Sequence, residues 1–321
     1  MTRKFIKQST DFGAYLALRI VICLIQTFSI ETCAAASRCV AILMSDVFRL
    51  RGKTVDDNLR LAFPQWTDRE RQVVRRHMWE HLILMVCEVA HAPRKIRETN
   101  WHKYVKIVGR REIVSYLLDR RPIVLVSGHF GNFEVGCFLI GLLGFSTSTI
   151  ARTLDNRYLD RWVKKFREKK GQYILDKDGS ASQVADLLAR GGKVTLLADQ
   201  FAGPKGCWVD FFGKPTSCHK AVALFTLGSK APMLVISNAR DGRPLHYTVR
   251  LEGLADPAQL PDELGSVPGL TRWYNQRLED AIRRTPDQYW WLHRRWRGDP
   301  PTRKGAKATP TNPAESQRPA A

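Results

Sequence analysis

The chain has 321 residues, with 51 lysines and arginines against 31 acidic residues, which gives a formal net charge of +20. This length allows one large domain or two small ones, and no shift in composition divides residues 50–298, so we expect one domain. The charge suits anionic or phosphorylated lipids, an acidic carrier protein or nucleic acid, but the absence of zinc-finger spacing and of an RNA-recognition signature argues against nucleic acid. The seven cysteines include no Cys-x-x-Cys pair and are expected to be reduced thiols without disulfides.

The N-terminus contains two largely apolar stretches, Ala14–Ile30 and Cys33–Val47, which are separated by Glu31. Each is shorter than the roughly 20 residues that cross a bilayer core. We therefore expect residues 1–50 to form a helical membrane anchor that dips into the bilayer or lies tilted in it. The basic residues expected on its cytoplasmic side are Arg3, Lys4 and Lys7. The alternative is a pair of buried helices in a soluble domain.

The capping box Thr67-Asp68-Arg69-Glu70 predicts the start of a long helix that continues to about Ala90. Strand and helix patterns alternate after it. Strands are expected at Val105–Val108, Ile123–Val126, Thr147–Ile150, Tyr173–Leu175, Val194–Leu197, Met233–Ser237 and Tyr247–Leu251, and helices at Glu112–Leu118, Leu159–Glu168, Gln183–Ala189, Ala221–Leu227 and Leu270–Ile282. This alternation predicts an α/β fold with a mostly parallel sheet flanked by helices over residues 51–298. Residues 299–321 have almost nothing to bury and are expected to be a disordered tail.

The long helix also carries His77-Met78-Trp79-Glu80-His81, which fits the His-x-x-Glu-His pattern of some zinc peptidases. The two histidines, four residues apart, would share one helix face. A third ligand and the longer sequence context of those enzymes are missing, so zinc hydrolysis is a minor alternative and no metal site is expected.

The most informative segment begins with the apolar run Ile123–Val126 and continues through Ser127 and Gly128 to His129. Glu134 follows five positions later and opens a second apolar run, which reads as a helix. His129 would stand at the carboxyl end of a strand, where open α/β sheets bind ligands. A neutral imidazole can remove a proton from a hydroxyl while a carboxylate on its other nitrogen fixes the tautomer, so the pair suits acyl transfer to an alcohol. The alternative is a histidine that ends a strand and a glutamate that stabilises a helix N-terminus.

Four blocks, in order, carry a resemblance to a known family. They are Asn58-Leu59-Arg60-Leu61-Ala62-Phe63-Pro64; Gly128-His129 to Glu134; Leu196-Leu197-Ala198-Asp199-Gln200 with Val209-Asp210-Phe211-Phe212-Gly213-Lys214-Pro215; and Pro286-Asp287-Gln288-Tyr289-Trp290-Trp291-Leu292-His293-Arg294-Arg295-Trp296. Together they resemble the late acyltransferases of lipid A biosynthesis, within the His-x4-Asp/Glu lysophospholipid acyltransferase-like superfamily. The resemblance covers roughly residues 10–297.

This resemblance implies a glycerolipid-acyltransferase-like fold and an enzyme of the bacterial inner membrane whose catalytic domain faces the cytoplasm. The reaction would move a fatty acyl group from a thioester of acyl carrier protein or coenzyme A to a hydroxyl of a phosphorylated glycolipid, with no cofactor. By position, His129 would be the general base and Glu134 its partner. The residues expected to bind substrate or stabilise the oxyanion are Arg152, Gly131, Asn132, Asp199 and Gln200.

Several alternatives stay open. The acceptor could be a lipid A precursor or another glycolipid such as a phosphatidylinositol mannoside, and a protein that only binds anionic lipid is the alternative outside enzymes. Arg152 could instead form an ion pair with Asp155 or Asp199. The aromatic and basic residues at 289–297 could form an interfacial belt or a core with a basic edge, and His293 could make a core hydrogen bond or a substrate contact. The basic run Lys164–Lys170 could be a solvated helix face or could dock an acidic carrier protein.

Overall fold

The computed structural model describes residues 2–168, 171–176 and 179–301. The long helices are α1 (Thr2–Thr27), α2 (Ile30–Ile42), α3 (Gly52–Ala62), α4 (Asp68–Lys95), α5 (Arg110–Leu118), α6 (Phe133–Leu142), α7 (Arg157–Glu168), α8 (Ser180–Ala189), α9 (Lys220–Gly228) and α10 (Val267–Arg284). Shorter turns of helix are η1 (Leu43–Val47), η2 (Trp101–Lys103), η3 (Asp262–Leu264) and η4 (Pro286–Gln288). The strands are β1 (Val105–Val108), β2 (Ile123–Ser127), β3 (Thr147–Ala151), β4 (Gln172–Asp176), β5 (Lys193–Leu197), β6 (Cys207–Phe211), β7 (Lys214–Cys218), β8 (Met233–Arg240) and β9 (Tyr247–Ala255).

Seven strands form one sheet in the order β1-β9-β8-β2-β5-β3-β4. All its neighbouring pairs are parallel except β8 and β9, so the predicted mostly parallel α/β sheet is confirmed. Every strand expected from the sequence is present within a residue or two, although β8 and β9 run longer. The hairpin of β6 and β7 forms a separate small sheet that the sequence did not predict.

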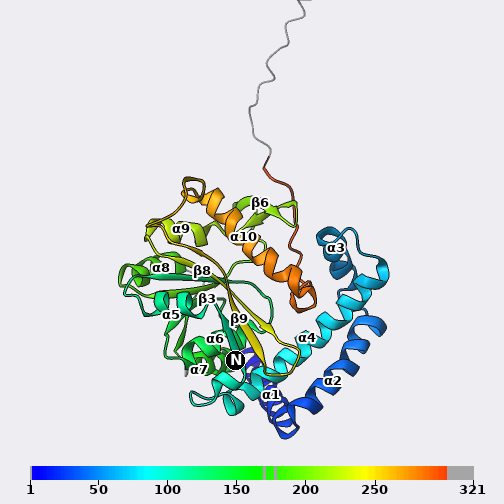
Figure 1. Ribbon diagram of the computed structural model, residues 1–321. Coiled ribbons are helices and arrows are strands. Elements are labelled where there is room, and N and C mark those ends of the chain that lie inside the picture. Colours follow the sequence, from blue (N-terminus) through cyan, green and yellow to red (C-terminus); the bar gives the residue numbers. More distant parts are fainter. Residues whose placement is uncertain (1, 169–170, 177–178, 302–321) are drawn as a thin grey trace, which may run out of the picture.

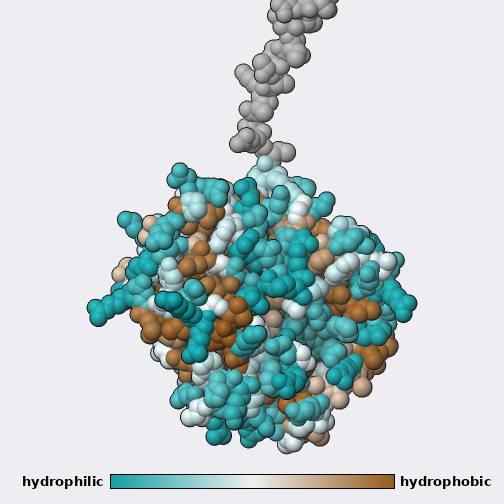
Figure 2. All heavy atoms as spheres, viewed as in Figure 1, coloured by the Kyte–Doolittle hydropathy of each residue, from teal (hydrophilic) through white to brown (hydrophobic). Residues whose placement is uncertain are grey.

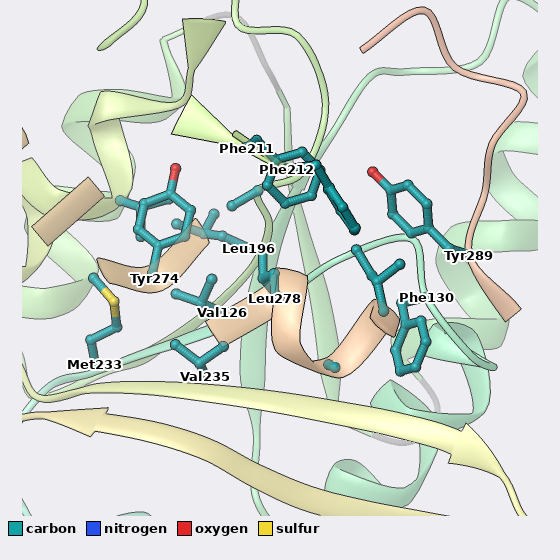
Figure 3. Close-up of a cluster of buried hydrophobic side chains, with 14 of the residues drawn as sticks. Val126, Phe130, Leu196, Phe211, Phe212, Met233, Val235, Tyr274, Leu278 and Tyr289 are labelled. Carbon is teal, nitrogen blue, oxygen red and sulfur yellow. The ribbon is translucent and has the colours of Figure 1, made fainter. Parts of the chain in front are cut away.

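The two faces of β2 divide the core, because successive side chains of a strand point to opposite faces. Val124 and Val126 belong to a cluster formed with α8, α9, α10 and the β6–β7 hairpin. Ile123 and Leu125 face α5 and α6 on the other side. Figure 3 shows how Tyr274 and Leu278 of α10 and the Phe211–Phe212 turn converge on the first face.

The N-terminal helices differ in how they contact this body. The side chains of Ile30, Cys33 and Ala34 on α2 are buried in a cluster with α4 and α6, so α2 is part of the folded domain. Helix α1 has an apolar stretch at Ile6–Thr27 that is long enough to cross a membrane, the single such helix within the described ranges, and none of it is buried. Of the residues 1–50 expected to form an anchor, α1 is therefore the long apolar helix that the folded domain leaves exposed. Figure 1 shows α1 and α2 beside α4, at the edge of the sheet domain.

The capping box at Thr67 and Glu70 is formed, and α4 extends past the expected end at Ala90 to Lys95. On the face seen in Figure 2, apolar residues reach the surface as separate patches among polar ones, including on the right of the view, where Figure 1 places α2 and α3. The expected disordered tail falls almost wholly on residues 302–321, which lie outside the described residues.

Candidate active site

His129 and Asp199 meet because β2 and β5 are neighbouring parallel strands. Their register places Ser127 beside Leu197, so the residues two positions further along each chain emerge side by side. The His129 Nδ1 atom lies 2.8 Å from Asp199 Oδ1, and the backbone N–H of His129 donates to Asp199 Oδ2 at 2.9 Å. A Cβ atom at Gly128 would lie 3.1 Å from the Asp199 carboxyl carbon, so the glycine permits this approach. One carboxylate therefore holds both the ring and the backbone of His129.

The charges of His129 and Asp199 stabilise each other in a largely buried site. The Asp199 side chain is 2% exposed and that of His129 20%. Burial alone would lower the pKa of His129, but the charge and hydrogen bond of Asp199 raise the pKa above its ordinary value. Burial alone would raise the pKa of Asp199, but His129 and, more weakly, Arg295 hold that pKa below its usual range. Asp199 is therefore ionised and favours a proton on Nδ1, which leaves Nε2 as the basic nitrogen.

Nε2 of His129 faces a cavity of about 580 Å³ at the carboxyl ends of these strands. The Gln200 Nε2 atom lies 3.3 Å from it and donates to the free lone pair. The cavity wall also includes Phe133, Glu134 and Arg167. A narrow apolar pocket of about 70 Å³ adjoins this cavity between the sheet and helices α5 and α6. The two share the lining residues Phe133, Cys137, Thr195 and Leu197.

Glu134 is not the carboxylate that orients His129, and the expected pairing of these two residues is corrected here. Glu134 stands in the first turn of α6 and its Oε2 accepts from Arg167 Nε of α7 at 3.2 Å. The helix turns its side chain toward α7, whereas Asp199 reaches His129 from the adjacent strand end. Glu134 remains on the cavity wall, where its charge adds to the causes that raise the pKa of His129.

Gly131 and Asn132 do not offer the backbone donors expected of them. The N–H of Gly131 donates to Gln288 O at 2.9 Å, and that of Asn132 to Asn238 O at 3.0 Å. The Asn132 side chain is fully buried, caps α6 by accepting from Val135 N, and donates to Glu88 at 2.9 Å. Both residues therefore build the loop, and their N–H groups cannot stabilise an oxyanion without breaking these bonds.

Replacing Gly131 with alanine should inactivate the protein by distorting this loop. Gly131 has φ +58°, and a Cβ atom would lie 2.0 Å from the Asn238 carbonyl oxygen. We expect the free energy of unfolding to fall by more than about 1–3 kcal/mol, which is the cost of backbone strain alone. Gly144→Ala is the matched control, since Gly144 also has a positive φ but no atom within 4 Å of the new methyl. Thermal unfolding of both variants measures the difference, and equal losses would contradict the assigned packing role.

Arg152 lies at the cavity edge, and its side chain is 79% exposed. It contacts Asp155 at 3.4 Å, which is one of the two ion pairs considered for it. Asp199 instead pairs with His129.

The C-terminal aromatic and basic block proves to be a core element that fastens the site. Phe130 and Tyr289 form an isolated antiparallel bridge, and Trp290 N donates to His129 O at 3.0 Å. The neighbouring Tyr289 ring is buried, and burial followed by the charge of Asp199 raises the pKa of Tyr289 well above its ordinary value. A core with a basic edge was one of the two alternatives for this block, and the burial of Tyr289 and Trp291 confirms it; the contacts with the His129 loop were not predicted.

The same block also holds the segment after Asp199. Phe201 N donates to His293 Nε2 at 3.0 Å, which settles His293 as a core hydrogen-bond partner. Arg295 is 1% exposed, and its Nη1 donates to Gln200 O at 3.1 Å and Ser217 O at 2.7 Å. The predicted basic edge therefore includes one arginine that is inside the protein.

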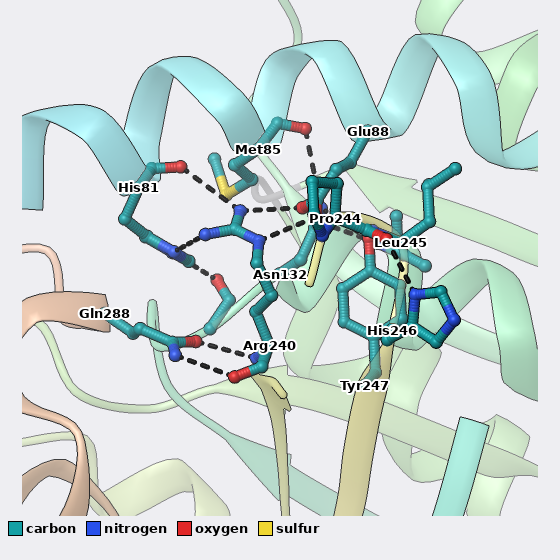
Figure 4. Close-up of polar contacts among 12 residues, drawn as sticks. His81, Met85, Glu88, Asn132, Arg240, Pro244, Leu245, His246, Tyr247 and Gln288 are labelled. Atoms are coloured by element: carbon teal, nitrogen blue, oxygen red, sulfur yellow. Dashed lines mark hydrogen bonds and ion pairs between the residues drawn. The ribbon is translucent and has the colours of Figure 1, made fainter. Parts of the chain in front are cut away.

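A second polar cluster contacts the loop at Gly131 and Asn132 (Figure 4). Its hydrogen bonds argue against the zinc site considered for His77 and His81. Arg240 donates to Glu88 through Nε and Nη2, each at 2.7 Å, and through Nη1 to His81 Nδ1 at 2.8 Å. The other ring nitrogen of His81 lies 3.2 Å from Gly131 O. Burial and then the Arg240 charge lower the pKa of His81 to about 3, so the ring is neutral. Both nitrogens serve this cluster, so His77 and His81 do not form a metal-binding pair.

The family model described as "Bacterial lipid A biosynthesis acyltransferase" matches residues 5–298. The chain belongs to this family. A lipid A biosynthesis acyltransferase of Haemophilus influenzae is 27% identical over 250 residues, which are 76% of each chain. A lipid A biosynthesis lauroyltransferase of Escherichia coli is 24% identical over 78% of this chain and 80% of its own, and a palmitoleoyltransferase of the same species is 24% identical over 76% and 78%.

Among solved structures, the 1-acyl-sn-glycerophosphate acyltransferase PlsC of Thermotoga maritima aligns with a TM-score of 0.38 and 13% identity, over 82% of this chain and 100% of that chain. The family model confirms the membership inferred from four sequence blocks, and the protein is an acyltransferase. In this acyltransferase, three of the four blocks meet around His129, and the first reaches the last through Asn58, whose Nδ2 donates to Trp291 O at 2.7 Å.

Proposed function

We propose that this acyltransferase moves a fatty acyl group from an acyl thioester to a hydroxyl of a lipid A precursor, with His129 as the general base. The observation that carries the proposal is the contact between His129 Nδ1 and the buried Asp199 carboxylate, which leaves Nε2 toward a large cavity. The similar proteins of Haemophilus influenzae and Escherichia coli are lipid A biosynthesis acyltransferases, and the geometry supplies a base without requiring a serine or cysteine nucleophile.

The reaction needs one group that takes and returns a proton, and it forms no covalent intermediate on the protein. His129 Nε2 takes the proton of the acceptor hydroxyl while its oxygen attacks the thioester carbonyl carbon. Asp199 stabilises the imidazolium that forms. The tetrahedral intermediate collapses, the C–S bond breaks, and the imidazolium returns its proton to the departing thiolate. A positioned base of this kind contributes about 10²–10⁴-fold.

The oxyanion needs donors on the cavity side of His129. The Gln200 amide lies 3.3 Å from His129 Nε2. An acceptor hydroxyl that bonds to Nε2 would replace the amide there, which leaves the amide N–H to donate to the oxyanion. Phe133 and Glu134 form the first turn of α6 and line the cavity, so the positive end of that helix also faces the reacting atoms. We assign the oxyanion to these two sources in place of the backbone of Gly131 and Asn132.

The acyl donor needs a pocket for its chain and a surface for its carrier, and the residues around the cavity can supply both. The apolar pocket that adjoins the cavity at Cys137 and Thr195 suits the start of an acyl chain. The exposed residues Arg157, Arg161 and Lys165 recur every four positions along α7, and Arg167 at its end lines the cavity. This basic stripe suits an acidic acyl carrier protein. The predicted basic run continued to Lys170, and residues 169–170 lie outside the described chain.

The enzyme would work at the inner membrane with its cavity on the cytoplasmic side. The exposed apolar helix α1 and the net charge of +20 support contact with a membrane surface that carries anionic lipids. A phosphorylated acceptor would meet Arg152 and Arg167 at the cavity.

Activity should rise with pH through an inflection above 6.5, the ordinary pKa of histidine. His129 must be neutral to accept a proton, and its pKa is raised by Asp199. Below that pKa the ring is protonated and kcat/KM falls, and above it the base is available. The measurement is kcat/KM between pH 5 and 9 with one thioester donor. An inflection well below 6.5 would contradict a base held by Asp199.

The test of the function is transfer of labelled acyl groups in membranes by wild type and His129→Ala, with mass spectrometry of the total lipid extract. Loss of transfer in the variant, with equal accumulation in the membrane, supports the proposal, and the acylated product names the acceptor. Transfer at wild-type level would overturn the role of His129. A wild-type protein that binds anionic lipid but acylates none would favour the non-catalytic alternative.

A further inference from the structure

Helix α1 has two distinct faces. Asp11, Tyr15, Leu18, Ile22 and Ile25 recur every three or four positions and are partly buried. This spacing keeps them on one side of a helix. The other side carries Leu16, Ile20, Leu24 and, just past the helix end, Phe28, which are each about half exposed, at 49–57%. We call these four residues the outer stripe. One side of α1 therefore contacts the protein, and the other presents apolar side chains to the surroundings.

The inner side of α1 is fastened near both ends. Toward its start, Asn156 Nδ2 donates to Asp11 O at 2.8 Å, and the Phe12 ring meets Tyr158 of α7 edge-on at 5.4 Å between centroids. At its end, Gln26 Nε2 donates to Ala90 O of α4 at 2.7 Å. Figure 1 shows the N-terminus beside α7 and the helix running toward the turn into α2.

The two fastenings conflict with a helix that crosses the bilayer. Residues 11 and 26 are separated by about 22 Å of helix, at 1.5 Å per residue, while the apolar core of a bilayer is about 30 Å thick. A crossing helix would have to leave the protein over this length and give up the contacts at one end. The inner side would then expose Asp11 and Gln26 to lipid.

Arg19 adds an independent argument. It lies near the middle of the apolar stretch Ile6–Thr27, and its Nη1 donates to the Tyr15 hydroxyl at 3.0 Å. At the centre of a crossing helix, an arginine costs roughly 2.5–3.5 kcal/mol or more. In a helix that lies along the membrane surface, the long Arg19 side chain can place its guanidinium among the headgroups while its methylene groups stay in the apolar layer.

We propose that α1 lies in the plane of the bilayer surface, with the outer stripe in the boundary between headgroups and acyl chains, and does not span the membrane. Lys7 and Arg19 then face anionic headgroups. The N-terminus stays on the same side of the membrane as the active-site cavity. Helix α7, which touches α1 at Tyr158 and the cavity at Arg167, is thereby held at the membrane surface. This inference rests on the membrane association in the proposed function.

The first test cross-links α1 to α7 in intact membranes. The full chain with Cys23→Ser and Cys39→Ser, which removes the exposed native thiols of the N-terminal helices, carries Phe12→Cys with Tyr158→Cys and is treated with a short bis-maleimide. Leu16→Cys with Tyr158→Cys is the matched control from the outer stripe. We expect the joined peptide, by mass spectrometry, for the first pair in membranes and detergent alike, and much less for the second. A product of the first pair in detergent that disappears in membranes would overturn the proposal.

The second test reads sidedness and does not depend on reactive geometry. Lys7→Cys and Lys165→Cys, each in that same background, are labelled with a membrane-impermeant maleimide in inverted and right-side-out inner-membrane vesicles. Labelling of both from the same side is expected, and labelling from opposite sides would show that α1 spans. Flotation of the vesicles keeps the two proposals apart: a chain that fails to float has lost membrane association altogether, whereas one that floats with opposite-side labels refutes only the in-plane helix.

Discussion

Replacing Asp199 with asparagine should lower kcat/KM by about 10³–10⁴-fold while the fold persists. Asparagine is nearly isosteric, but it cannot supply the charge that stabilises the imidazolium and it no longer fixes the proton on Nδ1. The pKa of His129 should also fall, because burial would then act without its main opposing cause. The acid limb of the pH profile should therefore move to lower pH. Single-turnover transfer as a function of pH measures both effects.

Glu134→Gln is the control for this variant. It removes a carboxylate from the same cavity, but one that pairs with Arg167 and does not hydrogen-bond His129. We expect a smaller loss of kcat/KM and a smaller displacement of the acid limb. If Glu134→Gln loses as much as Asp199→Asn and moves the pH profile as far, Glu134 is the orienting carboxylate after all.

Replacing Glu88 with glutamine should lower the free energy of unfolding by about 3–5 kcal/mol. Glu88 is fully buried and accepts two charge-assisted hydrogen bonds from Arg240, which is itself largely buried. The neutral amide leaves the guanidinium without its counter-charge, and a buried charge that loses its partner is strongly destabilising. The variant also disturbs the Asn132 side chain that caps α6, so activity should fall with stability.

Glu80→Gln on the same helix provides the comparison. Its ion pair with Arg38 is 3.2 Å long, but the Arg38 side chain is 68% exposed. A surface pair of this kind contributes about 0–1 kcal/mol. Urea unfolding of the two variants in detergent should separate them clearly, and similar midpoints would mean that the Glu88 cluster adds little to stability.

The sheet could be predicted from sequence because its strands are short apolar runs between turns. The position of His129 at a strand end followed from the same pattern. Its partner could not be found in this way, because Asp199 is 70 residues away. The two meet only because β5 inserts between β2 and β3 in the sheet order. Strand order is a property of the whole fold, whereas the spacing from His129 to Glu134 is local and drew the assignment to the nearer carboxylate.

The role of the C-terminal block was hidden for a related reason. Tryptophan, tyrosine and arginine side by side fit a membrane belt or a core with a basic edge. Arg295 is buried because backbone carbonyl groups of Gln200 and Ser217 receive its protons, and no pattern in the sequence indicates those partners. The hairpin of β6 and β7 was also not predicted from the sequence; its register places Pro215 opposite Asp210.

The attachment of residues 288–295 to both halves of the site has a consequence during synthesis. The loop that carries His129 is bonded to Gln288 and Trp290, and the Asp199–Gln200 segment to His293 and Arg295. These partners follow the strands that carry His129 and Asp199 in the chain, whereas α1 precedes those strands. A growing chain therefore exposes its apolar helix α1 long before His129 and Asp199 are held in place, and the site cannot form until residues 288–295 have left the ribosome.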